Sequence, residues 1–524
     1  MNGRTYTAAS AAILAALGLG ILAADSNGNS SEGPWPMAGH DLANSRSQPD
    51  ETRIGKSNAS SLAVKWTFRT GGDVSATPTV GNDAVFFPDW AGNLYAVRKD
   101  NGQQIWTARI SQYDGVPNAY ARVSPVLHGP DLIIGDIASP ATGAQLHDGA
   151  RVMAVNRQTG ALHWVTQVEK NPAAVITGSP VVAGDVVVVG VSSNEEALAD
   201  QPGYVCCTFR GSMVALDANT GKMLWQTYTV PENGGKTGGY SGGAIWQPAA
   251  VDAARGLIYV GTGNNYSVPE SVSSCQASAS AGMATPCTDA ADYFDSVLVF
   301  NLRTGAIVRS RRLHGYDVWT VACTSPKPGV TCPSPAGPDY DLSGSGPNLL
   351  AGMVGFGQKS GVYWALDPTD NDVIWSTAVG PGSTLGGIEW GSATDGSRIY
   401  AAITNNLHGT YKLQPQGENI SWGSWAALNA RTGRIVWQTA DPTEGAVDMG
   451  AVSVANGVVY AGSFSGTMAA MDARTGTILW TFNSGGSVVD GPAIADGVVY
   501  WGSGYAHIKP GKANNAVFAF APTR

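Results

Sequence analysis

The chain has 524 residues, with 67 glycines, 29 prolines and 16 tryptophans but only 14% charged residues. This composition is typical of many short strands joined by tight turns and argues against long helices. The net charge is −9 and no basic block occurs, which argues against nucleic acid or an anionic membrane surface as a partner.

The N-terminus has the layout of a cleavable signal peptide. Arg4 is followed by an apolar run that ends near Ala24, and a polar segment rich in glycine and serine comes next. The apolar run is short for a membrane span, and no other run approaches about 20 residues. We therefore expect a signal peptide over residues 1–24, no integral membrane span after its cleavage, and a periplasmic or secreted protein.

A hairpin that ends in tryptophan recurs along the chain. In each copy an apolar pair and a polar residue lead into a turn, usually Thr-Gly, and the tryptophan stands four residues after the glycine position. The spacing of about 62 residues exceeds the ~40–50 of WD40 or kelch blades. Six copies end at Trp106, Trp164, Trp225, Trp375, Trp437 and Trp480, and a seventh has Arg309 in the tryptophan position.

A second hairpin alternates with the first, so that each repeat supplies four antiparallel strands, which make one blade of a β-propeller. Its eight copies begin near Thr77, Ser124, Ser179, Gln247, Gly346, Gly391, Gly450 and Gly491. They predict an all-β, eight-bladed β-propeller over residues 63–524, preceded by an N-terminal extension at 25–62.

The eighth tryptophan hairpin is split between the two ends of the chain. Residues 516–520 end the sequence without a following turn, and residues 63–68, with Trp66, begin it. Pairing these terminal strands in one blade closes the ring and removes a sheet edge. We expect the tryptophans to be wedges between neighbouring blades rather than ligand contacts.

The cysteines are even in number and fall into three local pairs. In an exported protein this pattern predicts three disulfides. None of the cysteines stands in a Cys-x-x-Cys-His context, so we expect no covalent haem. The pairs are Cys206 with Cys207, Cys275 with Cys287, and Cys323 with Cys332.

Polar and charged residues recur at equivalent positions of consecutive blades, just before the first strand or just after the second. These positions share one face of a propeller, so we expect them to converge on a central pocket. Carboxylate and amide oxygens suit calcium, basic side chains suit a ligand with carboxylates, and tryptophan offers a stacking face. The residues are Arg122, Thr177, Trp246, Asp339, Asp341, Trp390 and Asp448 before the first strand, and Glu195, Glu196, Asn264, Lys359 and Asn405 after the second.

At these residues the chain resembles the quinoprotein alcohol dehydrogenases, most closely their polyvinyl alcohol dehydrogenase branch without its haem domain. The tryptophan hairpin is similar to the tryptophan-docking motif of that family. The segment from Trp246 to GLIYVGTGN matches a stacking tryptophan followed by a calcium-ligating asparagine, here Asn264. GQKSG matches the site of the basic residue at the quinone carbonyls, here Lys359, and ARVSP matches a cofactor-binding arginine, here Arg122.

Two assignments stay open. The family carries its catalytic aspartate in a Trp-Asp-Tyr-Asp run, and this chain has two partial matches, HGYDVWT with Asp317 and PDYDLSG with Asp339 and Asp341. Reading the cysteine-containing segment between them as an insertion favours Asp339. The calcium-ligating glutamate lies in VSSNEE, where gap-free spacing favours Glu195 and one inserted residue favours Glu196.

The resemblance implies pyrroloquinoline quinone (PQQ) held on a calcium ion, with Asp339 among the calcium ligands and Thr177, Trp390 and Asn405 as further cofactor contacts. The aspartate is then the general base for the substrate hydroxyl, and hydride passes from the alcohol carbon to the quinone. The polyvinyl alcohol branch favours a secondary alcohol, polymeric ones included. A separate electron acceptor is implied, such as a c-type cytochrome.

Two other functions fit a propeller built of this repeat. A cofactor-free scaffold of the cell envelope would keep its tryptophan hairpins but have degenerate rim residues, whereas Arg122, Trp246, Asn264 and Lys359 are all present here. A carbohydrate-binding propeller or lyase fits the aromatic content, but it does not account for the aligned calcium-type ligands.

Overall fold

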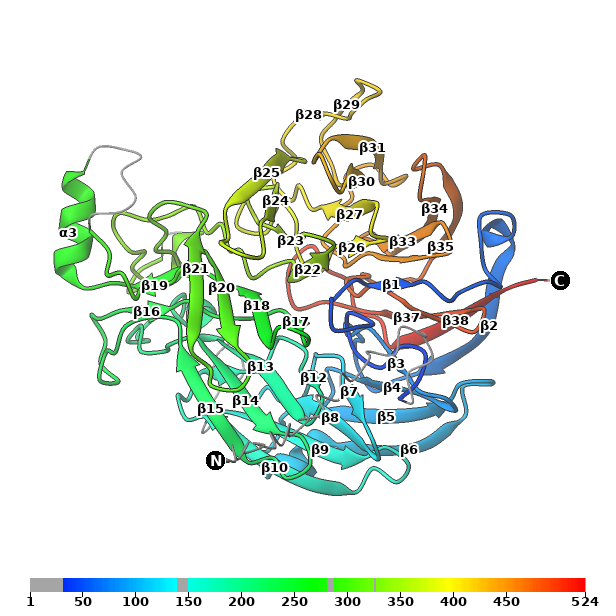
Figure 1. Cartoon of the computed structure of the whole chain (residues 1–524), viewed down its shortest axis with the longest axis horizontal. Helices are drawn as coiled ribbons and strands as arrows, with labels where there is room; N and C mark the ends of the chain where they lie inside the picture. Colours follow the sequence, from blue (N-terminus) through cyan, green and yellow to red (C-terminus); the bar gives the residue numbers. More distant parts are fainter. Residues whose placement is uncertain (1–31, 139–148, 280–286, 325–326, 524) are drawn as a thin grey trace, which may run out of the picture.

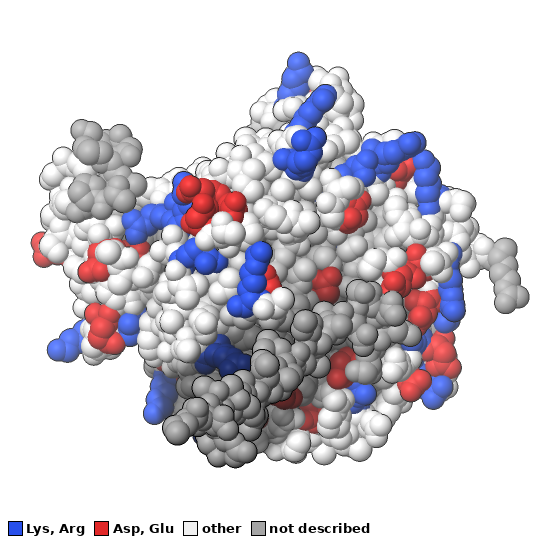
Figure 2. Space-filling model, in the orientation of Figure 1, with Lys and Arg blue, Asp and Glu red and all other residues white. Residues whose placement is uncertain are grey.

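The computed structural model describes residues 32–138, 149–279, 287–324 and 327–523. Eight four-stranded antiparallel sheets are arranged about one axis, which confirms the predicted eight-bladed β-propeller (Figure 1). Each sheet runs from a short inner strand near the axis to an outer strand at the rim. On the face that Figure 2 shows, charged side chains are dispersed among uncharged residues.

The first four blades follow one another along the chain. They are β3 (Thr79–Val80), β4 (Ala84–Pro88), β5 (Asn93–Arg98) and β6 (Gln104–Arg109); β7 (Val126–His128), β8 (Asp131–Gly135), β9 (Ala150–Asn156) and β10 (Leu162–Glu169); β12 (Val181–Ala183), β13 (Val186–Ser193), β14 (Ser212–Asp217) and β15 (Met223–Tyr228); and β17 (Ala250–Asp252), β18 (Leu257–Gly261), β20 (Ser296–Asn301) and β21 (Ile307–Arg312).

Three further blades continue this order. They are β22 (Pro347–Leu350), β23 (Met353–Gly357), β24 (Val362–Leu366) and β25 (Val373–Ala378); β26 (Ala393–Thr394), β27 (Arg398–Ile403), β30 (Ser424–Asn429) and β31 (Ile435–Ala440); and β32 (Ser453–Ala455), β33 (Val458–Gly462), β34 (Thr467–Asp472) and β35 (Ile478–Asn483).

The eighth blade joins the two ends of the chain, as the split hairpin predicted. β36 (Ala493–Ala495), β37 (Val498–Ser503) and β38 (Ala516–Pro522) supply three strands, and the N-terminal β2 (Leu62–Arg69) pairs antiparallel with β38 as the outermost strand. In Figure 1 the blue β2 therefore lies beside the red β38. Closure leaves no blade with a missing neighbour, so the ring presents no open end.

The remaining elements are short and lie in loops or at sheet edges. They are β1 (Ser47–Gln48), β11 (Ala174–Val175), β16 (Ser241–Gly242), β19 (Asn265–Ser267), β28 (Tyr411–Lys412), β29 (Asn419–Ile420), α1 (Ile110–Asp114), α2 (Glu195–Leu198), α3 (Glu270–Ser278), and the 3₁₀ helices η1 (Ala59–Ser61) and η2 (Val321–Cys323). Among the described residues no helix combines the length and apolar composition that a membrane span requires.

Neighbouring blades are fastened by the repeated tryptophan. Each indole N–H donates to a backbone carbonyl of the next blade, over 2.8 to 3.2 Å. The ring lies on the glycine of the next turn, where a Cβ at Gly102 would come within 2.8 Å of Trp66. The donor and acceptor pairs are Trp66 with Lys99, Trp106 with Arg157, Trp164 with Ala218, Trp225 with Leu302, Trp375 with Ala430, Trp437 with Ala473, and Trp480 with Leu62.

At one contact between blades, both the tryptophan and the glycine are replaced by other residues. Arg309 stands in the tryptophan position, and its Nη2 donates to the carbonyl of Pro368 at 2.9 Å. The turn it faces has Asn371, buried and at φ 66°, where the other turns have glycine. Arg309 and Asn371 therefore depart from the repeat at the same contact between blades.

The N-terminal segment before β2 runs along the inner edges of the blades. It supplies carbonyl acceptors to inner strands of six blades, and buried Arg46 adds side-chain bonds to the carbonyl of Val452 and the hydroxyl of Thr77. Strand edges that would otherwise face the axis unpaired are thereby satisfied. The backbone donors and acceptors are Val80 with Trp35, Leu127 with Pro36, Val251 with Leu42, Leu349 with Ala43, Thr394 with Ser45, and Val454 with Arg46.

The three expected disulfides are present. They join Cys206 to Cys207, Cys275 to Cys287, and Cys323 to Cys332. All three lie in loops between strands, the second closing the chain around α3 and the third closing the segment between the two partial aspartate motifs.

Candidate functional site

A buried ion cluster lies where two consecutive blades meet the axis. Lys359 follows β23, and its Nζ lies 2.9 Å from Oδ1 of Asp339 and 2.9 Å from Oδ2 of Asp341, which both precede β22. The ammonium also lies 5.7 Å from the ring centre of Trp246, in the neighbouring blade. Burying such charges is costly unless they are paired, so the ammonium and the two carboxylates depend on one another to stay charged in this position.

The three candidate aspartates differ in their free oxygens. Asp317 accepts backbone N–H bonds from Asp339 and Tyr340, one on each oxygen. Asp341 accepts from Lys359 and from the backbone N–H of Asn264. Asp339 is bonded through Oδ1 alone, and its Oδ2 is buried without a partner among the described residues.

The carboxyl of Asp339 is held in an unusual environment. Burial raises its pKa well above the ordinary value, and the neighbouring Lys359 opposes that rise. Its backbone has φ 61°, in the left-handed region that non-glycine residues seldom adopt. Such strained positions are concentrated at functional sites.

Asn264 presents a fixed amide beside this cluster. Its Nδ2 donates to the carbonyls of Asn265 and Trp319, at 2.9 and 2.8 Å. Because both amide hydrogens are used, the Oδ1 is the atom left for a ligand. The residue before it, Gly263, has no side chain, and a Cβ there would lie 2.6 Å from Asp341.

The two candidate glutamates, consecutive in α2, have different environments. Glu195 accepts backbone N–H bonds from Thr208 and Phe209, at 2.8 and 2.7 Å, and the hydroxyl of Tyr204. Glu196 has its Oε1 buried without a partner among the described residues. Burial raises the pKa of Glu196 to about 8, with Lys359 opposing the rise and Asp341 adding to it.

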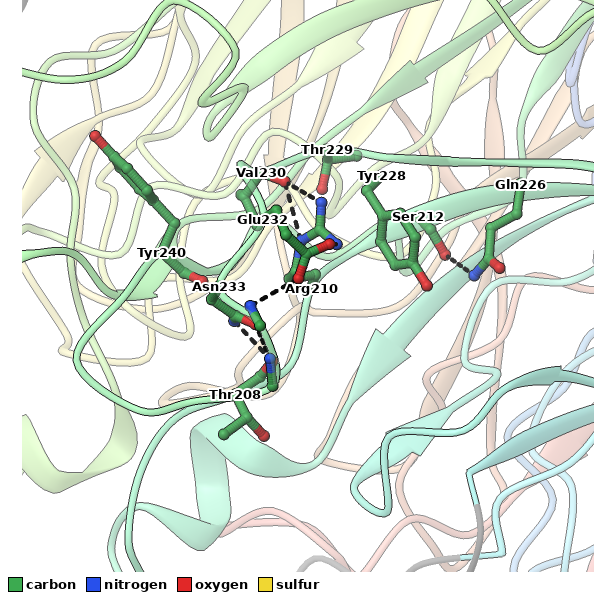
Figure 3. Close-up of polar contacts among 12 residues, drawn as sticks. Thr208, Arg210, Ser212, Gln226, Tyr228, Thr229, Val230, Glu232, Asn233 and Tyr240 are labelled. Carbon is green, nitrogen blue, oxygen red and sulfur yellow. Dashed lines mark hydrogen bonds and ion pairs between the residues drawn. The ribbon is translucent and has the colours of Figure 1, made fainter.

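Figure 3 shows the framework that holds the loop bonded to Glu195. Asn233 donates through Nδ2 to the carbonyls of Thr208 and Tyr240. Arg210 pairs with Glu232 at 2.6 Å. The loop is therefore fixed from both sides, and Glu195 belongs to that framework.

A second group surrounds the guanidinium of Arg122. It lies 5.2 Å from the ring centre of Trp390 and 5.9 Å from that of Trp90, and Nη1 donates to the hydroxyl of Tyr505 at 3.3 Å. Sequence reasoning predicted Arg122 and Trp390 but missed Trp90 and Tyr505. These two come from the first and last blades, which ring closure makes neighbours.

Glu389 is a further carboxylate that sequence reasoning missed. It is buried, its Oε1 has no partner among the described residues, and it lies within electrostatic range of both Lys359 and Arg122. Burial raises its pKa to about 8, while Lys359 opposes that rise. Its place directly before Trp390 was the signal available in the sequence.

Two other predicted cofactor contacts have different surroundings. Thr177 keeps a buried hydroxyl without a partner in the described part of the chain. The side-chain amide of Asn405 is hydrogen-bonded within its own loop. Its Nδ2 donates to the carbonyls of Gly409 and Trp422, and its Oδ1 accepts from the backbone N–H of Gly409.

The described residues fit a cation together with a polar ligand. Buried polar groups without partners are rare in native proteins and call for a missing partner. Carboxylates outnumber the cationic groups in this region, which favours a hard cation with oxygen ligands. Four of the unpartnered atoms belong to the candidate residues described above: Oγ1 of Thr177, Oε1 of Glu196, Oδ2 of Asp339 and Oε1 of Glu389.

Two family models match parts of the chain. Residues 35–325 match the family model described as glucose/ethanol/alcohol dehydrogenase, beta-propeller domain, of the PQQ type. Residues 421–521 match the family model described as outer membrane protein assembly factor BamB.

Two similar relatives are both named polyvinylalcohol dehydrogenase. The protein from Sphingopyxis sp. (strain 113P3) is 33% identical, over 85% of this chain and 68% of the relative. The protein from Pseudomonas sp. is 31% identical, over 90% of this chain and 73% of the relative.

Among solved structures, the quinohemoprotein alcohol dehydrogenase from Comamonas testosteroni superposes with a TM-score of 0.69. The superposition covers 95% of this chain and 81% of the Comamonas chain. At 20% identity this similarity bears on the fold alone. The chain belongs to the PQQ-dependent alcohol dehydrogenase family, and it is an oxidoreductase of the alcohol dehydrogenase type.

Proposed function

We propose that this chain oxidises secondary alcohols with PQQ held on a calcium ion, and that Asp339 is the general base. The observation that carries the proposal is the different bonding of the two oxygens of Asp339: Oδ1 accepts a hydrogen bond from Lys359, while Oδ2 is buried and has no partner among the described residues. A carboxylate oxygen without other partners can accept the proton of a substrate hydroxyl, and Lys359, which lowers the pKa of Asp339 against the effect of burial, favours the ionised form that does so.

The cation ligands on this proposal are Glu196 and Asn264, and Asp339 adds a negative charge beside them while its Oδ2 stays free for the substrate proton. Glu196 is preferred to Glu195 because the latter already accepts four hydrogen bonds from its own loop. The cofactor would be held by Arg122, Trp246, Lys359 and Trp390, with Thr177 and Asn405 as outer contacts. When bound, the quinone supplies the acceptor for the hydride of the alcohol carbon, and calcium polarises it.

The protein side chains then manage charge and water. Asp339 takes the hydroxyl proton, and Lys359 keeps a positive charge within 2.9 Å of both Asp339 and Asp341 as negative charge develops nearby. Trp246, which packs closely against Gly344, gives the site an apolar wall that excludes water.

We also propose that the protein works outside the cytoplasm after removal of residues 1–24, which lie outside the described residues. All six cysteines are paired, so none is available in this chain to attach a haem. Electrons would therefore leave to a separate carrier, for which a c-type cytochrome is the proposed class.

The test is a titration of the metal-stripped protein with PQQ and calcium, followed by dye reduction with primary and secondary alcohols. Lanthanum is titrated in parallel, because a cluster so rich in carboxylates also suits other hard cations. Cation-dependent quinone binding with dye reduction by secondary alcohols is the expected result. Failure to bind the quinone with either cation would overturn the proposal and favour an envelope scaffold, the alternative to which the match of residues 421–521 points.

A further inference from the structure

A second group of metal-ligand side chains lies at the open end of the hairpin formed by β20 and β21. Asp295 directly precedes β20 and His314 follows β21 by two residues, so the pairing of the two strands brings them close together. The backbone N–H of Leu313 donates to the carbonyl of Asp295 and fixes this end of the hairpin. Asp317 joins them from the segment that follows β21, and one ligand atom of each of the three residues lies within 4.8 Å of the others.

Asp295 is the member of this group that most needs a partner. Its side chain is 0% exposed, and neither carboxylate oxygen has a hydrogen-bond partner among the described residues. The guanidinium of Arg312 lies within electrostatic range, but its two Nη atoms donate to the hydroxyl of Thr288 and the carbonyl of Asp292. A buried carboxylate without donors is costly, so either a proton or a cation has to accompany Asp295.

A proton shared between Asp295 and Asp317 would satisfy the two carboxyl groups but not the histidine. Nδ1 of His314 is buried and has no partner in the described part of the chain. The ring of Tyr340 meets the imidazole edge to face, with 5.1 Å between the ring centres, and so holds it beside the carboxylates. A cation bonded at ~2.0–2.2 Å to imidazole nitrogen and carboxylate oxygen would partner all three side chains at once.

The donor set of this group differs from that of the proposed calcium site. It contains none of the residues that the proposed function assigns to calcium or to the quinone. Calcium takes oxygen ligands, whereas a set that includes an imidazole suits zinc and the neighbouring transition metals. Three protein ligands with a water in the fourth position is a common arrangement around zinc in proteins.

We propose that Asp295, His314 and Asp317 bind one zinc ion, at a site separate from the calcium. This inference goes beyond the proposed function and does not depend on it. Asp317 connects the two sites, because its oxygens accept the backbone N–H groups of Asp339 and Tyr340. The zinc ion would therefore fix the segment that holds Asp339 at its left-handed φ of 61°.

The test is a calorimetric titration of the metal-stripped, full-length protein with zinc chloride, in the presence of excess calcium to occupy the calcium site. We expect wild type to bind zinc at a single site. Asp295→Asn and His314→Gln should each raise the Kd for zinc about tenfold or more, since even the loss of an outer-shell partner has an effect of this size.

His163→Gln is the matched control. Nδ1 of His163 lies 2.9 Å from a carboxylate oxygen of Asp131, but this histidine is 56% exposed and stands outside the group. Its replacement should leave the Kd for zinc unchanged. Zinc binding of wild-type affinity in both Asp295→Asn and His314→Gln would overturn the inference.

Two measurements on wild type keep the test decisive if a variant does not fold. Crystals soaked in zinc should give an anomalous scattering peak between Asp295, His314 and Asp317. Zinc should also raise the thermal unfolding temperature in excess calcium. The absence of zinc binding in excess calcium, or an anomalous peak only at another position, would overturn the inference and leave a shared proton between the two aspartates. Neither readout involves alcohol oxidation, so the inference and the proposed function can fail independently.

Discussion

Lys359 and Asp339 form a buried ion pair in which the ammonium nitrogen lies 2.9 Å from one carboxylate oxygen and leaves the other without a partner. The lysine thus fixes which oxygen of Asp339 is free. It comes from the loop after β23, whereas Asp339 comes from the segment before β22, so the pairing depends on the hairpin between these strands.

Replacing Lys359 by methionine leaves Asp339 and Asp341 buried without a counter-charge. We expect the free energy of unfolding of the cation-free protein to fall by about 3–5 kcal/mol, the usual cost of removing one partner of a buried pair. Urea unfolding measures it. Added calcium should restore part of the loss, because the cation supplies positive charge to the same carboxylates. Equal stability of variant and wild type would show that the carboxylates are protonated in the cation-free protein.

Changing each of the two consecutive glutamates to glutamine should affect different properties of the protein. Glu196→Gln should raise the Kd for calcium about tenfold or more, because a carboxylate ligand becomes a neutral amide. Glu195→Gln should instead lower stability, because its new amide N–H₂ would face the backbone donor of either Thr208 or Phe209. Calorimetric titration of the metal-stripped variants measures affinity. If Glu195→Gln had the larger effect on calcium, the ligand assignment would have to be exchanged.

Glu389 should give the protein a measurable pH dependence. Burial raises its pKa to about 8 from the ordinary 4.5, so the folded protein keeps a proton that the unfolded chain has lost between these values. Stability contributed by this group is present at low pH and decreases as pH rises toward about 8, by up to ~1.4 kcal/mol per pH unit. In calcium-free buffer Glu389→Gln should lose less stability than wild type between about pH 5 and about pH 8. Parallel pH profiles of unfolding would contradict this.

Arg309 and Asn371 replace the tryptophan and the glycine of the repeat at one contact between blades. We therefore expect substitutions at these two positions to have strongly coupled effects on stability. Arg309→Trp alone should destabilise the protein, because at the equivalent turns a Cβ comes within 2.4 to 2.9 Å of the tryptophan ring. Asn371→Gly alone should also destabilise it, by opening a gap beside the guanidinium. The double variant should recover stability, with a coupling energy of about 0.5–3 kcal/mol in a thermal-unfolding cycle. Additive effects would show that the two positions do not share one space.

The fold was predictable because its signals are local and repeated. Each tryptophan hairpin occupies a short window, and the absence of a turn after residue 520 matched the missing half of a hairpin at Trp66. The local hairpin pattern is therefore enough to predict each blade, and the number of blades with the split hairpin is enough to predict the closed ring. Arg309 was recognised as a departure, but its link to Asn371 required the structure, because the two lie in different blades.

The site was predictable only in part, for two physical reasons. The ring brings residues together from distant parts of the chain, such as Arg122 and Tyr505, 383 positions apart, and no local pattern indicates such a contact. Consecutive residues of a helix point about 100° apart, so one position of phase decides whether Glu195 or Glu196 faces the ion cluster. The ligand and cofactor roles of these residues stay predictions until the titrations are made.

The pairing of β2 with β38 also fixes the order in which the protein can finish folding. β2 is synthesised early, yet its neighbour in the blade is made after the strands of the other seven blades. Until that strand is released, the growing chain is an arc with an unpaired strand at its start, the kind of edge that invites association with other chains. A transcript cut short before Ala516 would therefore yield a product whose first strand never gains a partner, however well its other seven blades fold.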